Sequence, residues 1–330
     1  MTRPTVLVLL DSPDSTVDDV RPSVLELLTI GRELGRVDVV TLGAPSVSVL
    51  ATLGAYGVGF VHQATLPTSV PASAHRVTSV LASVLVAAVR RTDADVLLVP
   101  SSFAGKEAAA VAAARLGAGY VSDASAVTWS DGVAPLRVAK RVFAGTWDTV
   151  STVATDPAVV TVRANAVAAE PAETPTHPEV EALQVEVAAP AVTVVAREVK
   201  PRTAGRPVLE EAAVVVAGGR GTNGDFGPVE DLADALGAAV GATRDVVFEG
   251  WFDRYIGQTG VTVAPRVYIG AGISGAPHHR GGMQASQVVV AVNNDPEAPI
   301  FEISDFAVVG DLADVLPQAA AAIREHKARP

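Results

Sequence analysis

The sequence predicts an α/β protein of two domains, an N-terminal domain built on a mostly parallel sheet and a C-terminal Rossmann-like domain. Apolar runs of strand length alternate with stretches of helical periodicity through most of the chain. At 330 residues the chain is also long for a single hydrophobic core. The stretch PRTAGRP, residues 201–207, precedes a fresh strand-to-helix start. We therefore expect domains at residues 1–200 and 208–330, joined by a linker at 201–207.

The first domain begins with an alternation of strands and helices. Strands are expected at residues 6–10, 37–42, 59–63 and 95–100. Helices are expected after them at residues 21–34, 46–53, 73–91 and 106–116. In the third helix, Val77, Val80 and Val84 recur at helical spacing. Because strands that alternate with helices pair in parallel and are covered on both faces, this pattern predicts a mostly parallel sheet.

From about residue 120 the pattern changes to short strands joined by turns such as Asp131-Gly132 and Asp156-Pro157. Strands are expected at residues 121–129, 136–143, 146–154 and 159–163, and we expect them to extend the same sheet. A proline-rich connector follows at residues 170–178, and a further strand is expected at 192–195.

Composition excludes several classes of function. The net charge of −11 argues against a nucleic-acid-binding protein. The chain has no cysteine, which excludes disulfides, thiolate metal sites and cysteine nucleophiles, and favours a cytoplasmic location. No apolar run approaches the ~20 residues that span a bilayer. The N-terminus lacks the cleavage site of a signal peptide, so none is predicted.

A glycine loop follows the first strand of the second domain, which is expected at residues 213–217. Residues 219–224 match the pattern G-x-G-x-x-G and precede a helix expected at 229–236. Glycines let a backbone approach phosphate oxygens, and Arg220 could add a bidentate contact. Four residues separate the motif from the helix, unlike the dinucleotide fingerprint, so a plain strand-to-helix turn stays open as an alternative.

Two later loops carry candidate ligand-binding groups. Residues 240–245 end the next strand, where Arg244 could overhang a bound ring or simply pair with Asp245 on the surface. Residues 256–260 offer backbone N–H groups between Gly257 and Gly260, with the side chains of Gln258 and Thr259. Such a set suits the polar edge of a heterocycle, and an ordinary turn is the alternative.

Residues 265–311 contain three more apolar runs, at 267–269, 288–292 and 306–309, each followed at once by polar or glycine residues. In an open parallel sheet the loops at the carboxyl ends of strands gather on one edge, and ligands bind there. Ser274 is expected to cap a helix starting near Gly275, with Pro277 in its first turn. His278 and His279 diverge by about a quarter turn of that helix. A shared metal is therefore not expected, and His279 is assigned to the ligand and His278 to solvent.

Taken together, these segments resemble the alpha subunit of electron-transfer flavoproteins, most closely over about residues 214–317. The motifs that carry the resemblance are GGRG at 218–221, VGATR at 240–244, GQTG at 257–260, YIGAGISGA at 268–276, APIF at 298–301 and VGDL at 309–312. The first domain fits more loosely, through Gly105-Lys106, Val121-Ser122-Asp123 and Phe143-Ala144-Gly145.

The resemblance implies an FAD-binding C-terminal domain and an electron carrier without catalytic residues or metal ligands. It implies that Arg220 lies on the phosphate side, that Thr243 and Arg244 lie near the flavin ring, and that Gln258 and Thr259 face its N5 side. The segment from Ser274 to His279 would wrap the ribityl and pyrophosphate, with His279 near the C2 carbonyl of the ring, and Asn293 and Asp311 would hold the adenosine. The full set of expected FAD contacts is Arg220, Gly221, Thr243, Arg244, Gly257, Gln258, Thr259, Gly260, Ser274, Gly275, Ala276, Pro277, His278, His279, Asn293, Asp311 and Leu312.

The resemblance further implies a heterodimer with a beta subunit. Electrons would pass singly from acyl-CoA and related flavin dehydrogenases of fatty acid β-oxidation to a membrane quinone oxidoreductase. Two other functions stay open at this point. One is an NAD(P)-dependent enzyme that uses the glycine loop, although no acid–base pair stands out. The other is a flavin-poor scaffold subunit of the same fold.

Overall fold

The computed structural model describes residues 3–11, 16–130, 135–143, 146–187, 192, 194–196 and 205–329. The chain divides into two compact units, one formed by residues 1–140 and 149–199 and the other by residues 141–148 and 200–330. We call them the first and the second unit, and each is described by itself. The α/β class with parallel sheets in two regions is confirmed. The linker at 201–207 stays a prediction, and its residues 201–204 lie outside the described residues.

A seven-stranded sheet forms the centre of the first unit, and the strand pairs are all parallel. Its spatial order is β12-β5-β3-β1-β6-β11-β7. The strands are β1 Thr5–Leu10, β3 Arg36–Thr41, β5 Phe60–Thr65, β6 Val96–Pro100, β7 Gly119–Ala124, β11 Ala158–Val162 and β12 Glu179–Gln184. Strands β2 Thr16–Val17 and β4 Ala44–Pro45 form a separate two-stranded parallel sheet.

Helices cover both faces of this sheet. They are α1 Pro22–Leu34, α2 Val47–Ala55, α3 Thr78–Thr92 and α4 Phe103–Leu116, with a 3₁₀ turn η1 at Ala72–Arg76. Strand β1 is an unbroken run of apolar residues because both of its faces are buried. Val6, Val8 and Leu10 pack into the core with α1, whereas Leu7 and Leu9 pack into the core with α3 and α4.

Several expectations for residues 1–200 are wrong in detail. Strands β8 Ala126–Trp129, β9 Leu136–Val142 and β10 Trp147–Val153 form a separate sheet instead of extending the main one. The change of direction coincides with Asp123, whose φ of 58° is left-handed, and with a register shift between β11 and β7. The helix expected at 73–91 is interrupted at Val77, which has an extended backbone. Helix α4 starts at Phe103 because the Ser102 hydroxyl accepts the Gly105 N–H as its N-cap.

The strand expected at residues 192–195 is not found at 192, 194 and 195, and Thr193 lies outside the described residues. The edge strand is instead β12, which pairs with β5 from Glu179 opposite Phe60. The turn at Asp131-Gly132 and residues Ala144 and Gly145 also lie outside the described residues.

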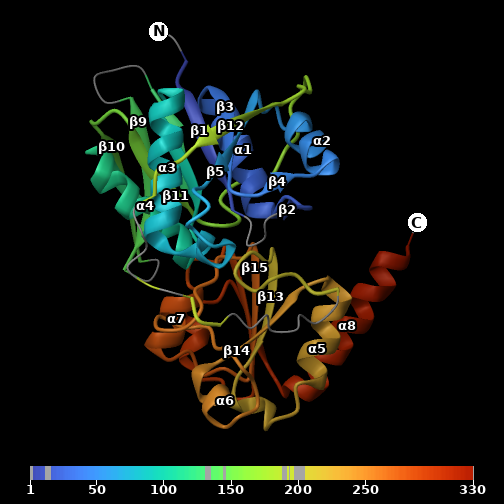
Figure 1. Ribbon diagram of the computed structural model, residues 1–330. Coiled ribbons are helices and arrows are strands. Elements are labelled where there is room, and N and C mark those ends of the chain that lie inside the picture. Colours follow the sequence, from blue (N-terminus) through green and yellow to red (C-terminus); the bar gives the residue numbers. More distant parts are fainter. Residues whose placement is uncertain are drawn as a thin grey trace. The chain divides into compact units, whose positions relative to one another are not determined.

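A five-stranded parallel sheet in the order β14-β13-β15-β16-β17 forms the second unit. The strands are β13 Val214–Gly218, β14 Ala239–Ala242, β15 Val267–Ala271, β16 Val288–Asn293 and β17 Phe306–Val309. The helices are α5 Gly227–Leu236, α6 Arg244–Phe248, α7 Pro277–Met283 and α8 Leu312–Ala328, with 3₁₀ turns η2 Arg220–Thr222 and η3 Pro299–Ile303. Helices α5 and α8 lie side by side against one face, and α7 packs on the other (Figure 1).

The strand order locates the binding edge of this sheet. The chain goes from β13 to β14 on one side and then returns to β15 on the other, so the direction of winding reverses between β13 and β15. In open α/β sheets ligands bind in the crevice at the carboxyl ends of the strands, where this reversal occurs.

Candidate cofactor site

A cavity of about 530 Å³ lies at the carboxyl edge of the second unit's sheet. It is lined by the loops that follow β13, β14, β15, β16 and β17, as expected for a switch-point site. The cavity brings together most of the expected site residues: Arg220, Gly221, Thr243, Arg244, Gly257, Gln258, Thr259, Ser274, Ala276, His278, His279, Asn293, Asp311 and Leu312. Gly260, Gly275 and Pro277 do not line it.

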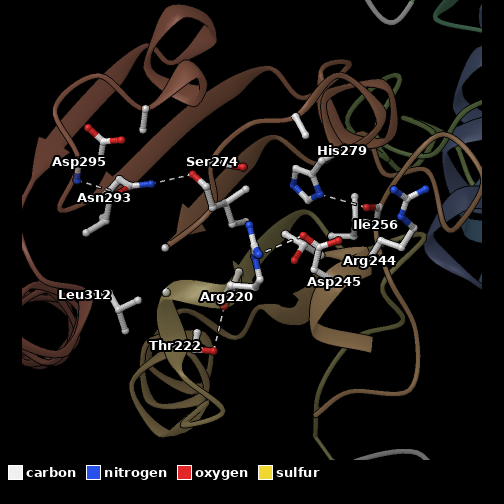
Figure 2. A pocket seen from close by; sticks show the side chains of 18 of the residues that line it. Arg220, Thr222, Arg244, Asp245, Ile256, Ser274, His279, Asn293, Asp295 and Leu312 are labelled. Atoms are coloured by element: carbon white, nitrogen blue, oxygen red, sulfur yellow. Dashed lines mark hydrogen bonds and ion pairs between the residues drawn. The ribbon is translucent and has the colours of Figure 1, made fainter. Parts of the chain in front are cut away.

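The lining residues are spread along the cavity (Figure 2). Asn293, Asp295 and Leu312 lie on one side of the view, and Arg244, Ile256 and His279 lie on the opposite side. Arg220 and Asp245 lie between these two groups. The site is therefore elongated, with an amide and carboxylates at one end and a guanidinium at the other.

The glycine loop, residues 219–224, serves mainly to pack against the loop after β15. The Gly219 N–H donates to the Ala271 carbonyl at 2.9 Å, and the Gly221 N–H donates to the Gly272 carbonyl at 3.1 Å. A Cβ on Gly219 would lie 2.2 Å from the Gly272 carbonyl oxygen, so only glycine permits this approach. These amides are not available to a phosphate, which leaves the side chain of Arg220 as the loop's cationic group for an anion.

Arg220 forms an ion pair across the cavity with Asp245, with 3.4 Å between Nε and Oδ2. The surface pair of Arg244 with Asp245 that the sequence allowed is not formed. Adjacent residues on a helix diverge by about 100°, so the Asp245 carboxylate points toward the glycine loop instead. Both members of the pair are more than half exposed, which makes the pair weak and sensitive to salt.

In the loop at residues 257–260, the N–H groups of Gly257, Gln258 and Gly260 donate to carbonyls of the protein, so these three are not free to bind a ligand. Gln258 N–H donates to the His278 carbonyl at 2.8 Å, and Gly260 N–H donates to the Gly257 carbonyl at 3.1 Å. The side chains of Gln258 and Thr259 are what the loop presents to the cavity. Gly260 has no room for a Cβ, which would lie 2.4 Å from the Tyr255 carbonyl oxygen.

His279 is buried, with both ring nitrogens bonded inside the protein. Its Nδ1 lies 3.0 Å from the Ile256 carbonyl, and its Nε2 lies 2.7 Å from the Tyr268 hydroxyl. The carbonyl can only accept, so Nδ1 carries the proton and Nε2 accepts from the hydroxyl. Burial lowers the pKa of His279 to about 4 and raises the pKa of Tyr268. The ring therefore has no free N–H for a flavin carbonyl in this structure, and His279 positions Ile256 and the loop that follows.

His278 is exposed, and its Nδ1 lies 3.4 Å from Gln258 Oε1. Helix α7 begins at Pro277, later than the start expected near Gly275, and Ser274 does not cap it. The residue before the helix is Ala276, and the Ser274 carbonyl accepts the Ile300 N–H at 2.9 Å. This hydrogen bond links the loop that contains Ser274 to η3. Gly275 adopts a φ of 88°, a conformation that favours glycine.

Asn293, at the opposite end of the cavity, and Asp311, another lining residue, are held by local hydrogen bonds. Asn293 Nδ2 donates to the Ile273 carbonyl at 2.9 Å, and its Oδ1 accepts from Asp295 N–H at 3.0 Å. Asp311 caps α8 by accepting the Ala313 N–H at 2.9 Å. These bonds fix the orientation of both side chains at the cavity wall.

Sequence reasoning missed three residues that build the site. The sequence suggests Asp245 only as a partner of Arg244, whereas it pairs with Arg220. Gly272 has a φ of 62°, packs closely against Gly221 and accepts the Gly221 N–H at its carbonyl. Gly282 in α7 contacts the loop at Gly257, where a Cβ would lie 2.3 Å from the Gly257 nitrogen. The glycine pair in PHHRGGM was the only sequence signal for this close approach.

Within the described ranges, no cluster of three or more His, Cys, Asp or Glu side chains could hold a metal ion. The helices of those same ranges include none long and apolar enough to cross a bilayer.

The doubly wound sheet and its elongated switch-point cavity define a nucleotide-cofactor-binding α/β protein. Comparison with known families specifies the class. The family model for the electron transfer flavoprotein domain matches residues 12–188. The model for the electron transfer flavoprotein FAD-binding domain matches residues 208–284. The chain belongs to the electron transfer flavoproteins, in the alpha-subunit family, and its cofactor is FAD.

Individual relatives support the same assignment. The chain is 42% identical over 313 residues to the electron transfer flavoprotein subunit alpha of Mycobacterium leprae, covering 92% of this chain and 93% of the relative. It is 40% identical over 330 residues to the corresponding subunit of Mycobacterium tuberculosis (strain H37Rv), covering 98% and 99%. A Bacillus subtilis subunit alpha is 40% identical over 219 residues, covering 64% and 66%. The comparisons give no support to an NAD(P)-dependent enzyme or to a scaffold subunit.

Proposed function

We propose that this chain binds one FAD in the second unit's cavity and carries single electrons without converting a substrate itself. The observation that carries the proposal is the order of groups along the cavity, with Asn293 and Leu312 at one end, Arg220 in the middle and Arg244 at the other (Figure 2). This order fits adenosine, pyrophosphate and flavin ring in turn. The expected residues that line the cavity remain the proposed contacts, and Gly260, Gly275 and Pro277 act through the geometry of their loops.

Arg244 is the residue that we place beside the flavin ring. When bound, FAD supplies the one-electron redox chemistry, and the protein tunes it with fixed charges near the ring. Arg244 lines the cavity, is exposed, and follows Thr243 at the start of α6. A guanidinium there favours negative charge on the ring over the neutral form. Gln258 and Thr259 would orient the same end of the cofactor through their side chains.

We further propose a heterodimer with a beta subunit of the same family. Acyl-CoA and related flavin dehydrogenases would donate electrons, and a membrane quinone oxidoreductase would accept them. The cysteine-free composition supports a cytoplasmic site of action. Membership of the alpha-subunit family supports the partner.

Arg244→Ala should lower the potential for the first electron on the bound flavin. Removing a nearby cation makes it harder to add negative charge, and an effect of about tenfold in the equilibrium constant corresponds to about 59 mV. Spectroelectrochemical titration of the FAD-loaded protein measures this potential. Arg254→Ala, which removes an exposed arginine paired with Glu210 outside the cavity, is the control. A wild-type potential in Arg244→Ala contradicts the ring-side placement.

Asp245→Asn should tighten FAD binding by about two- to fivefold, the equivalent of a surface ion pair. The substitution releases Arg220 for the pyrophosphate and removes one negative charge from the cavity. Fluorescence titration of the flavin-depleted protein at low and at high salt tests this, because the gain should shrink as salt rises. Asp253→Asn is a matched exposed control. Weaker binding in Asp245→Asn would mean that the ion pair holds Arg220 in its binding position.

A further inference from the structure

The aromatic ring of Phe248, the last residue of α6, is 75% exposed and belongs to none of the hydrophobic cores. The neighbouring Phe252 contrasts with it, because Phe252 stacks on Phe226 at 5.3 Å between centroids and packs against the core. A single exposed phenylalanine needs no explanation by itself. What distinguishes Phe248 is the group that lies over its ring.

The guanidinium carbon of Arg244 lies 5.8 Å from the centroid of the Phe248 ring. The two residues are four apart on α6, the spacing at which side chains on one helix face meet. A cation at this distance over an aromatic face is attracted by the ring quadrupole. Arg244 therefore has a defined aromatic neighbour, Phe248, which does not itself line the cavity.

No carboxylate of the described residues lies within ion-pair distance of Arg244. Its sequence neighbour Asp245 is paired with Arg220 instead, at 3.4 Å. An aromatic partner holds a guanidinium without neutralising it, whereas a carboxylate would cancel its charge toward a ligand. The arrangement keeps Arg244 both restrained and fully cationic.

We propose that Phe248 is a positioning residue that holds the Arg244 guanidinium against the flavin ring and thereby raises the potential for the first electron. The inference rests on the proposed function, because it needs Arg244 at the ring. Phe248 does not line the cavity, so it acts through Arg244 and not by touching the cofactor. A long arginine side chain that is free to rotate spends less time at the ring, and its average effect on the potential is smaller.

Phe248→Leu and Phe248→Tyr separate this role from bulk, because leucine keeps an apolar side chain without a π face and tyrosine keeps the ring. Both are compared as FAD-loaded protein purified with the beta subunit. In Phe248→Leu the equilibrium constant for adding the first electron should fall by about two- to fivefold, the range of exposed cation–π contacts. Phe248→Tyr should stay at the wild-type value. Because the ring is exposed, both variants are expected to fold.

The double variant Arg244→Ala/Phe248→Leu completes the test. Its potential should equal that of Arg244→Ala alone, since Phe248 has no effect once the guanidinium is gone. A wild-type potential in Phe248→Leu beside a shifted Arg244→Ala overturns this inference alone. A Phe248→Leu shift that persists in the Arg244→Ala background also overturns it. An unshifted Arg244→Ala refutes the ring-side placement of Arg244, and this inference falls with it.

Discussion

Gly282→Ala is expected to abolish stable FAD binding while the first unit stays folded. The added Cβ would lie 2.3 Å from the nitrogen and 2.4 Å from the Cα of Gly257, both backbone atoms that cannot rotate away. Helix α7 and the 257–260 loop would have to separate. That movement strains the bonds from Gln258 N–H to the His278 carbonyl and from Val263 N–H to the Gly282 carbonyl. Overpacking of this kind costs about 1–3 kcal/mol of stability. Flavin content after gel filtration and urea unfolding measure the two effects.

Gly281→Ala is the matched control for this substitution. Gly281 is the neighbouring residue of the same helix and is only half-buried, and alanine is favoured over glycine inside a helix. The control should keep its FAD. If Gly282→Ala also retains FAD with wild-type affinity, the close approach of α7 to the loop does not shape the cofactor site.

Acidification is expected to destabilise the second unit through His279. Its pKa is about 4 in the folded protein, lowered by burial, and about 6.5 when unfolded. The unfolded chain therefore takes up the proton first as pH falls below 6.5. The contribution of the neutral histidine is complete above pH 6.5 and is lost progressively down to about pH 4, with a total near 3 kcal/mol. Urea unfolding of the second unit followed across this pH range measures the slope.

His279→Gln isolates that slope. An amide can donate to the Ile256 carbonyl and accept from the Tyr268 hydroxyl, but it does not titrate. The difference in unfolding free energy between wild type and variant should therefore change by the histidine's contribution between pH 6.5 and pH 4. His326→Gln, an exposed position in α8, should leave the wild-type slope in place. An unchanged slope in His279→Gln would show that other groups cause the acid lability.

The strands and the binding edge could be predicted because a parallel strand that is covered on both faces has a continuous run of apolar residues. The runs at 267–269 and 288–292 became β15 and β16, each extended at its carboxyl end, and the run at 306–309 became β17 with the same bounds. Their polar endings marked the carboxyl edge, and the cavity lies there. The three-stranded sheet of β8, β9 and β10 was not predicted, because short antiparallel strands have the same local pattern whichever sheet they join.

The direction of backbone N–H groups could not be predicted from the glycine motifs. G-x-G-x-x-G describes conformational freedom, and the partner of Gly219 and Gly221 is a loop some fifty residues later in the chain. The same holds for His279, whose free or occupied nitrogens depend on Tyr268 and Ile256. Adjacency in sequence was misleading for Arg244 and Asp245, since a helix sends neighbouring side chains in different directions.

The most direct test of this account is the identity and amount of the cofactor in the native protein. The full chain is purified with its beta subunit, denatured, and the released nucleotides are identified by mass spectrometry and quantified against protein. We expect one FAD for each alpha chain in the wild type, with loss of that FAD in Gly282→Ala and retention in Gly281→Ala. A wild-type preparation that releases stoichiometric NAD(P), or that takes up no FAD when it is supplied in excess, would contradict it.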